Sequence, residues 1–442
     1  MARHVGLAWR LRFAAVRYRF QESLFLFPAL VMLGGVLLAL IATAIDDALG
    51  DDATVPFTLA MSSNAATWLV ATVAGAMITT VGVVFYLTVV SLQLASDQFS
   101  PRVMRSFIRD RLSQGVIGLL VGTFFYCVLI LPTLSGEPTA PAPRESLTIA
   151  VLLTVITVVG IIVHLDHLAR GLQVGNVARV VSREGERVVA ALERVPTGLQ
   201  PADPTEFPPP RDATLLAAQT NGWISQVDSV GLLRTVPAGT VVRLETRVGA
   251  YIHAGEPLVT LWPTPSQQTR DRIVGAIEIT DARTMLQDVD FAIRQLVDIG
   301  LRALSPAIND PTTAVEIILR LGSLLRRLMV AGLAPPAIQD AQGRVLVQPW
   351  NLNHEEYVAH AFDQLRQRCL DQPDVAAALL RVLRMLSIHV HNEGHPERAA
   401  ALDEQQRLLL ESLANQPGLH PEDLARLQAL SSDDTDPADH SR

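Results

Sequence analysis

Four long runs of uncharged, mostly apolar residues occupy the first 170 positions of the chain, at 24–45, 65–95, 115–131 and 147–163. A helix rises about 1.5 Å per residue, and a hydrocarbon core is about 30 Å thick. All four runs reach the minimum of about 17 residues that a membrane helix needs, and the last two are at that lower limit. The pattern predicts four membrane helices, of which the second continues past the bilayer.

The second run carries small and polar residues on one helical face. Spaced by three, four or seven positions, they are Thr72, Gly75, Thr79, Gly82, Tyr86 and Gln93. One interpretation is a close helix-packing surface, because membrane helices associate through small residues and interhelical hydrogen bonds. The other is that this stripe lines a water-filled path. Both interpretations predict that the stripe faces away from lipid.

After the fourth run the pattern changes several times. Residues 171–193 have the period of an amphipathic helix, and prolines then mark a linker up to position 213. Alternation typical of strands occurs at 222–227, 240–244 and 249–261. Helical spacing returns at 273–304 and 315–330, and again over 353–430. The chain is thus expected to carry a small β-barrel-like module followed by a helical domain.

The predicted fold class is a mostly α integral membrane protein with four transmembrane helices, a cytoplasmic β module and a helical C-terminal domain. The expected divisions are a basic and aromatic arm (1–23), the transmembrane domain (24–170), a helical extension with a proline-rich linker (171–213), the β module (214–263), the helical domain (264–430) and a disordered acidic tail (431–442).

A polar turn separates two of the predicted helices, with Ser305, Asn309, Asp310, Thr312 and Thr313 as its candidate site residues. Pro306 ends the first helix, Asp310 can cap the second, and Pro311 stands where no amide proton is needed. The turn therefore has the signature of a helix cap. The alternative is a small polar site at a helix N-terminus that binds an ion or acts as a gating hinge.

The distribution of arginine predicts the orientation. The second connection holds Arg102, Arg105, Arg109 and Arg111, whereas the first holds four aspartates and no basic residue. The positive-inside rule then places both termini in the cytoplasm. The four arginines belong to a basic amphipathic segment that either holds lipid phosphates or steers anions toward a pore mouth.

The composition and the motifs of the chain argue against several classes of function. A mean hydropathy of +0.28 with 18% charged residues is too apolar for an ordinary soluble protein, and a net charge of −8 argues against nucleic acid as a partner. Two cysteines provide no disulfide or zinc framework. The sequence has no phosphate-binding glycine loop, nucleophile elbow or zinc-helix motif. We therefore expect no enzyme activity, cofactor or metal.

Residues 305–314, residues 98–102 and the four-span beginning together resemble the bacterial predicted membrane proteins of the DUF2254 family. The resemblance extends over nearly the whole chain. It implies a multi-pass protein of the bacterial inner membrane. It also implies that the polar turn is a characteristic feature, but it names no substrate.

Two functions remain open. The first is an oligomeric ion channel or channel-like transporter, in which the stripe lines the path of an inorganic ion and the cytoplasmic region regulates it. Four spans are too few to enclose a wide path, so this function requires a homo-oligomer. The second is a membrane-anchored scaffold or sensor without transport activity. In both, the lipid bilayer is the principal partner.

Overall fold

The computed structural model describes residues 26–49, 58–98, 111–134, 141–171, 173–192 and 198–431. The predicted arm (1–23), Arg102, Arg105, Arg109 and residues 432–442 of the predicted tail lie outside these ranges. The chain divides into two compact units, one of residues 9–173 and one built mainly from residues 174–442. We call them the membrane unit and the C-terminal unit.

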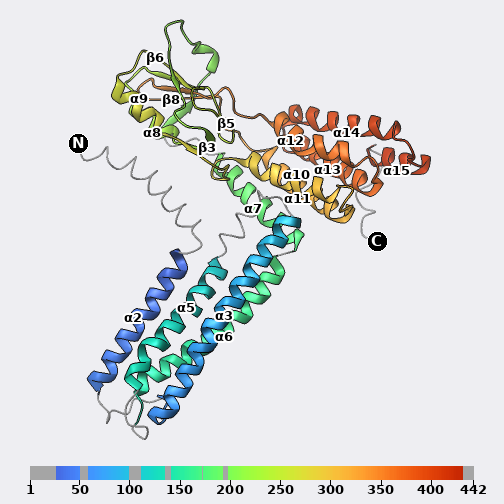
Figure 1. The fold of residues 1–442 in the computed structure, drawn as a ribbon. Helices are drawn as coiled ribbons and strands as arrows, with labels where there is room; N and C mark the ends of the chain where they lie inside the picture. The colour runs from blue at the N-terminus through green and yellow to red at the C-terminus, as the bar shows by residue number, and fades with distance from the viewer. Residues whose placement is uncertain are drawn as a thin grey trace. The chain divides into compact units, whose positions relative to one another are not determined.

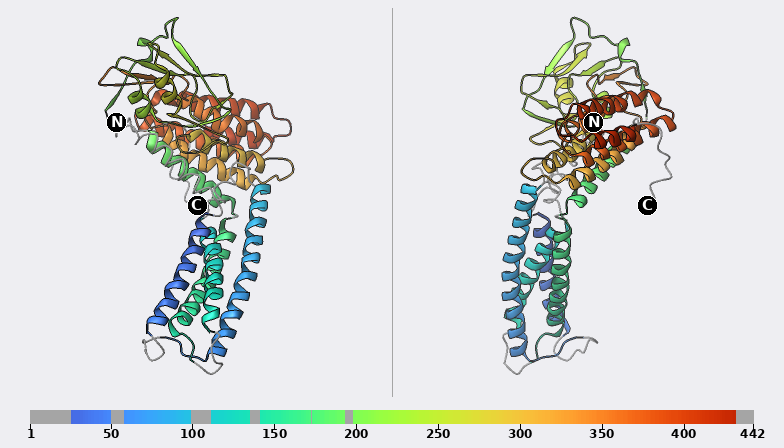
Figure 2. Two further views of the ribbon diagram at one scale, coloured as in Figure 1. Left: turned by 60° about the vertical axis from the view of Figure 1, so that its left-hand side comes forward. Right: turned by 90° about the vertical axis from the view of Figure 1, so that its right-hand side faces the viewer.

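Four helices long and apolar enough to cross a membrane make up the membrane unit, which confirms that prediction. They are α2 (Leu26–Leu49), α3 (Ser63–Gln98), α5 (Arg111–Ile130) and α6 (Arg144–Gly171), with a 3₁₀ turn, η1 (Leu131–Leu134), after α5. Figure 2 shows them running side by side in both of its views. The side chains of Leu120, Tyr126 and Ile130 on α5 are fully buried, so this helix occupies the centre of the bundle.

Glycine brings α2 and α5 into close contact. A Cβ atom on Gly118 of α5 would lie 2.8 Å from the Cβ of Val31 and 2.9 Å from the Cα of Pro28. Gly122, one turn further along α5, faces the backbone of Val31 in the same way. Membrane helices pack tightly where small residues let their backbones approach, and these two glycines provide that surface here.

Polar contacts fix α6 against the other helices. The carboxylate of Asp46 on α2 accepts hydrogen bonds from the backbone N–H groups of Glu145 and Ser146, both at 3.1 Å. The Tyr126 hydroxyl donates to the carbonyl of Ser146 at 2.9 Å. Asp46 thus satisfies free amides in the first turn of α6, as an N-cap residue would within one helix.

The C-terminal unit contains two open sheets (Figure 1). The larger sheet has the strand order β1-β8-β9-β4-β6-β2, and the smaller has the order β5-β3-β7. In chain order the strands are β1 (Leu199–Pro201), β2 (Thr214–Ala217), β3 (Gly222–Val227), β4 (Val241–Leu244), β5 (Tyr251–Ile252), β6 (Pro257–Trp262), β7 (Ile277–Thr280), β8 (Ala337–Asp340) and β9 (Val345–Val347).

The expectation of a β-barrel-like module is wrong, because the strands form two open sheets. Consecutive strands separate into different sheets, because β3 pairs with β5 and β7 while β2 and β4 both pair with β6. No strand within 198–431 therefore joins the two ends of either sheet. The larger sheet also recruits β1, β8 and β9 from outside residues 214–263.

Helices form the rest of the C-terminal unit. They are α7 (Val174–Leu192), α8 (Ser229–Thr235), α9 (Gln267–Val274), α10 (Val289–Ala303), α11 (Pro311–Leu328), α12 (His354–Arg368), α13 (Pro373–Asn392), α14 (Ala399–Ala414) and α15 (Pro421–Ser431), with short 3₁₀ turns η2 (Pro204–Glu206) and η3 (Pro396–Arg398). The helix expected over 273–304 is interrupted, because β7 lies within it. Only its second half, α10, is helical throughout.

Candidate functional site

The predicted stripe of α3 lies on the outer side of the membrane unit. Thr72, Gly75, Thr79, Gly82, Tyr86 and Gln93 are all exposed, Tyr86 at 66%. A Cβ atom on Gly75 or Gly82 would meet nothing within 4 Å. The opposite side of α3, with Val70 and Met77, is buried in the bundle. The structure thus brings the six residues onto one face and leaves that face uncovered by the described part of this chain.

Hydroxyl groups on this stripe are bonded to their own helix. Thr72 donates to the carbonyl of Trp68 at 2.7 Å, and Thr79 donates to the carbonyl of Gly75 at 2.8 Å. A threonine oxygen that donates its proton keeps lone pairs that can accept a hydrogen bond. The two threonines therefore offer neutral acceptors while their own hydroxyl protons are satisfied within the helix.

The polar turn forms the N-cap of α11. Asp310 accepts a hydrogen bond from the backbone N–H of Thr313 at 3.0 Å and one from its hydroxyl at 2.5 Å. Pro311 occupies the first helical position. The Thr313 hydroxyl is the main reason why the pKa of Asp310 is lowered from its ordinary value. Both carboxylate oxygens serve the cap, which supports the capping interpretation over an ion site.

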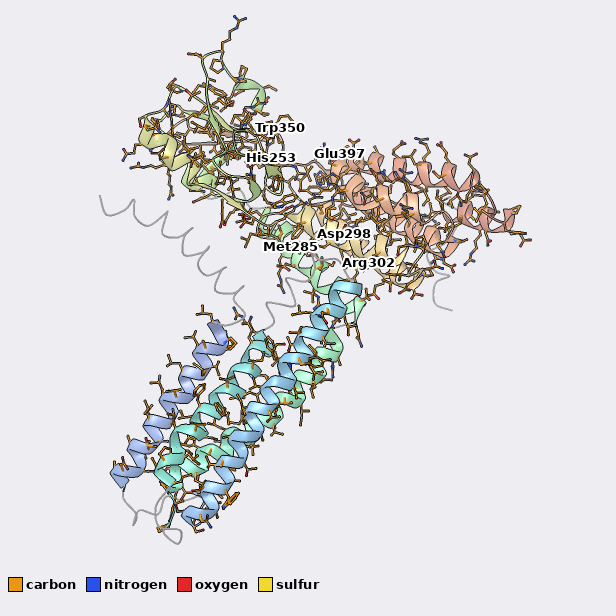
Figure 3. All side chains as sticks on the ribbon, in the orientation of Figure 1. His253, Met285, Asp298, Arg302, Trp350 and Glu397 are labelled. Carbon is orange, nitrogen blue, oxygen red and sulfur yellow. The ribbon has the colours of Figure 1, made fainter. Side chains whose placement is uncertain are left out.

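The side chains of Asn309 and Ser305 in the turn also bond within the protein. Asn309 has a φ of 47°, a left-handed conformation that asparagine tolerates. Its backbone N–H donates to the carbonyl of Ser305 at 2.8 Å, and its side-chain oxygen accepts from Gln372 at 3.1 Å. The Ser305 hydroxyl donates to the carbonyl of Arg302, labelled on α10 in Figure 3, at 2.7 Å. Thr312 is exposed.

A buried ionic cluster, which the sequence did not predict, joins the loop after β7 to α10 and α12. Arg283 donates to Asp288 through Nε at 2.6 Å and to Asp290 through Nη2 at 2.7 Å. The Nδ1 atom of His360 lies 2.7 Å from the carboxylate of Asp290. Asp288 and Asp290 are only 4% and 2% exposed. Asp288 also caps α10 by accepting from the backbone N–H of Phe291 at 3.1 Å.

Electrostatics within the cluster depend on these pairings. Burial alone would raise the pKa of Asp290, but hydrogen bonds from His360 and Arg283 together hold that pKa well below its ordinary value. The guanidinium group of Arg283 also lies over the rings of Trp223 and Phe291, at 5.5 and 5.4 Å. Among the described residues, no group of three or more His, Cys, Asp or Glu could hold a metal ion. The contacts of the cluster suit a rigid junction.

Comparison with known proteins identifies the family. The family model described as "Predicted membrane protein (DUF2254)" matches residues 21–385. The chain belongs to the DUF2254 family. The stripe, the polar turn and the ionic cluster all lie within the matched residues.

Curated relatives of this DUF2254 protein include the uncharacterized proteins Mb1321c of Mycobacterium bovis and Rv1290c of Mycobacterium tuberculosis. Each is 32% identical to this chain over 350 residues, covering 76% of this chain. The chain spans 66% of the length of these relatives, just under two thirds. No solved structure matches the chain.

Of the four arginines predicted to contact lipid or anions, Arg111 alone lies in the described residues. It is the first residue of α5 and is exposed. Arg102, Arg105 and Arg109 are outside the described ranges.

Proposed function

We propose that this DUF2254 protein is a protomer of an oligomeric channel, or channel-like transporter, for a small inorganic ion. The observation that carries the proposal is the uncovered stripe of α3. Glycine, threonine, tyrosine and glutamine gain little from contact with acyl chains, and polar residues in membrane helices usually face protein or water. In this proposal other copies of the chain cover the stripe, or share a water-filled path with it.

The centre of the bundle supports a path between chains rather than within one. Fully buried, bulky side chains of α5, including Leu120 and Tyr126, fill the space among the four helices. The stripe of α3 is on the opposite side of that helix from this core. A path lined by the stripe therefore needs several copies of α3 around one axis.

The proposal includes a location and a regulatory part. The protein resides in the bacterial inner membrane with both termini in the cytoplasm, as the arginine-rich second connection and the acidic first connection favour. The C-terminal unit is then cytoplasmic and regulates conduction.

Flux from liposomes tests the proposal. Purified protein is reconstituted with potassium inside, and efflux is followed with a potential-sensitive dye. The stripe variant Thr79→Leu with Gln93→Leu is expected to change the flux at least about tenfold, the effect of roughly 1.4 kcal/mol on a barrier. The control, Ile78→Leu with Val83→Leu, alters exposed apolar residues of the same helix and should leave the flux unchanged.

Oligomeric state is measured in the same preparations by light scattering after size exclusion. An oligomer that persists in the stripe variant while the flux changes supports the proposal. A monomeric parent protein, or an oligomer without flux for any monovalent ion, contradicts conduction and favours a membrane-anchored scaffold or sensor.

A further inference from the structure

Helices α7 and α11 lie side by side in the C-terminal unit. A Cβ atom on Gly175 of α7 would lie 2.9 Å from the carboxylate of Glu316 on α11, and one on Gly185 would lie 3.0 Å from the side chain of Leu324. Between these two points, the Ser182 hydroxyl donates to the carbonyl of Arg320 at 3.4 Å. The contact fixes both helices by their buried faces and leaves an outer face on each.

The outer faces are basic with apolar positions among the arginines. We call six of their exposed residues the α7–α11 surface, namely Arg179, Val180, Arg183 and Arg187 on α7 and Leu319 and Arg326 on α11. Val180 is 50% exposed and Leu319 is 53% exposed. The two helices together hold six arginines and three glutamates, whereas the whole chain has a net charge of −8. Positive charge is therefore concentrated here in an otherwise acidic protein.

Acidic residues do not neutralise the arginines of α7. Glu184 and Glu186 are half-buried at the borders between the buried and exposed faces of the helix, and Glu186 accepts from Ser182 at 3.5 Å. Arg183 and Arg187 make no ion pair with any residue in the described part of the chain. Their guanidinium groups remain available to an external anion.

We propose that the α7–α11 surface binds the anionic headgroups of the leaflet from which α6 emerges. An arginine near an anionic bilayer contributes about 1 kcal/mol, and apolar side chains between such arginines can enter the headgroup boundary. In the sequence, only Leu172 and Gln173 separate the end of α6 from the start of α7, so α7 follows a membrane span directly. This inference goes beyond conduction and holds whether or not the protein carries ions.

A spin label tests the proposal in the full chain. The label is attached to Val180→Cys, and its collision rate is measured with nickel chelated to lipid headgroups. The native cysteines Cys127 and Cys369 are buried, and unmutated protein treated with the label reports any background. Ile388→Cys on α13 is the matched control, since Ile388 is 47% exposed. Liposomes contain phosphatidylcholine alone or with 30% phosphatidylglycerol as an anionic lipid (about one lipid in three).

A charge variant separates lipid binding from simple proximity. Arg179→Gln, Arg183→Gln and Arg187→Gln remove three charges from the surface, and Arg211→Gln, Arg234→Gln and Arg381→Gln remove three exposed charges elsewhere. The headgroup collision rate at position 180 should exceed that at position 388 and should rise with phosphatidylglycerol. It should fall with the surface variant but not with the control variant, because the ratio of bound to unbound surface falls roughly fivefold for each arginine removed.

Equal collision rates at positions 180 and 388 overturn the proposal. So does a rate at position 180 that is the same with and without phosphatidylglycerol, or unchanged in the surface variant. Protection of position 180 by an acidic peptide, with no dependence on phosphatidylglycerol, would assign the surface to a protein partner and also overturn it.

Discussion

A Cβ atom on Gly35 of α2 would lie 2.6 Å from the carbonyl oxygen of Gly122 on α5. Real Cβ atoms do not approach backbone so closely, so any side chain at this position separates the two helices. A Cβ atom on the neighbouring residue, Gly34, would have no atom within 4 Å. Two adjacent glycines in one helix therefore have opposite tolerance for a methyl group.

We expect Gly35→Ala to destabilise the membrane unit by about 1–3 kcal/mol, the usual cost of overpacking. Gly34→Ala should be neutral or slightly stabilising, because alanine favours a helix by up to ~1 kcal/mol over glycine. Thermal unfolding in detergent, followed by circular dichroism, compares the two. Equal midpoints for both variants would show that α2 and α5 do not pack through this position.

The ionic cluster gives a second prediction. Arg283→Gln leaves Asp288 and Asp290 buried without their guanidinium partner, and breaking a buried pair in this way costs about 3–5 kcal/mol. Arg407→Gln is the control, since Arg407 pairs with Glu404 and Glu411 on the exposed face of α14, where ion pairs contribute little. Chemical denaturation monitored by tryptophan fluorescence should show a large loss for Arg283→Gln and no measurable loss for Arg407→Gln. Similar losses would rule out a structural role for the cluster.

A third prediction concerns the pH dependence of the polar turn. Because the pKa of Asp310 is lowered in the folded protein, its charged cap stabilises the fold above the ordinary aspartate pKa of about 3.9 and stops doing so as the pH falls through the lowered value. Thr313→Val removes the hydroxyl donor, so it should destabilise the protein by about 1 kcal/mol at pH 7. The difference from the parent should shrink below about pH 4.

Thr312→Val is the matched control, because Thr312 is exposed and its hydroxyl makes no hydrogen bond to Asp310. Unfolding midpoints between pH 3 and pH 7 measure both variants. A loss for Thr313→Val that is the same at every pH would contradict the role assigned to the Asp310 charge.

The membrane helices could be predicted because length and lack of charge decide whether a segment enters a bilayer. The cap at Asp310 could be predicted for a similar reason, since the determining residues are neighbours in the sequence. Such local signals need no knowledge of what the element packs against. The second half of the 273–304 pattern, which forms α10, belongs to the same class.

Features that depend on distant partners could not be predicted. The strand Val345–Val347 is too short to be distinguished from a loop, and its pairing with β4 is visible only in the fold. His360 and Asp290 meet across two helices that the sequence separates widely. Periodicity placed Thr79 and Gly82 on one face of α3, but it carried no information on whether that face is covered within the chain.

The parallel pairing of β4 with β9 has a consequence for biosynthesis. Val242 lies opposite Leu346, so one edge of β4 stays open while the ribosome translates the long segment that includes α10 and α11. An open strand edge invites pairing with other chains, and contacts between distant residues form late. A nascent chain interrupted before Val345 would therefore be aggregation-prone, even with all four membrane spans already inserted.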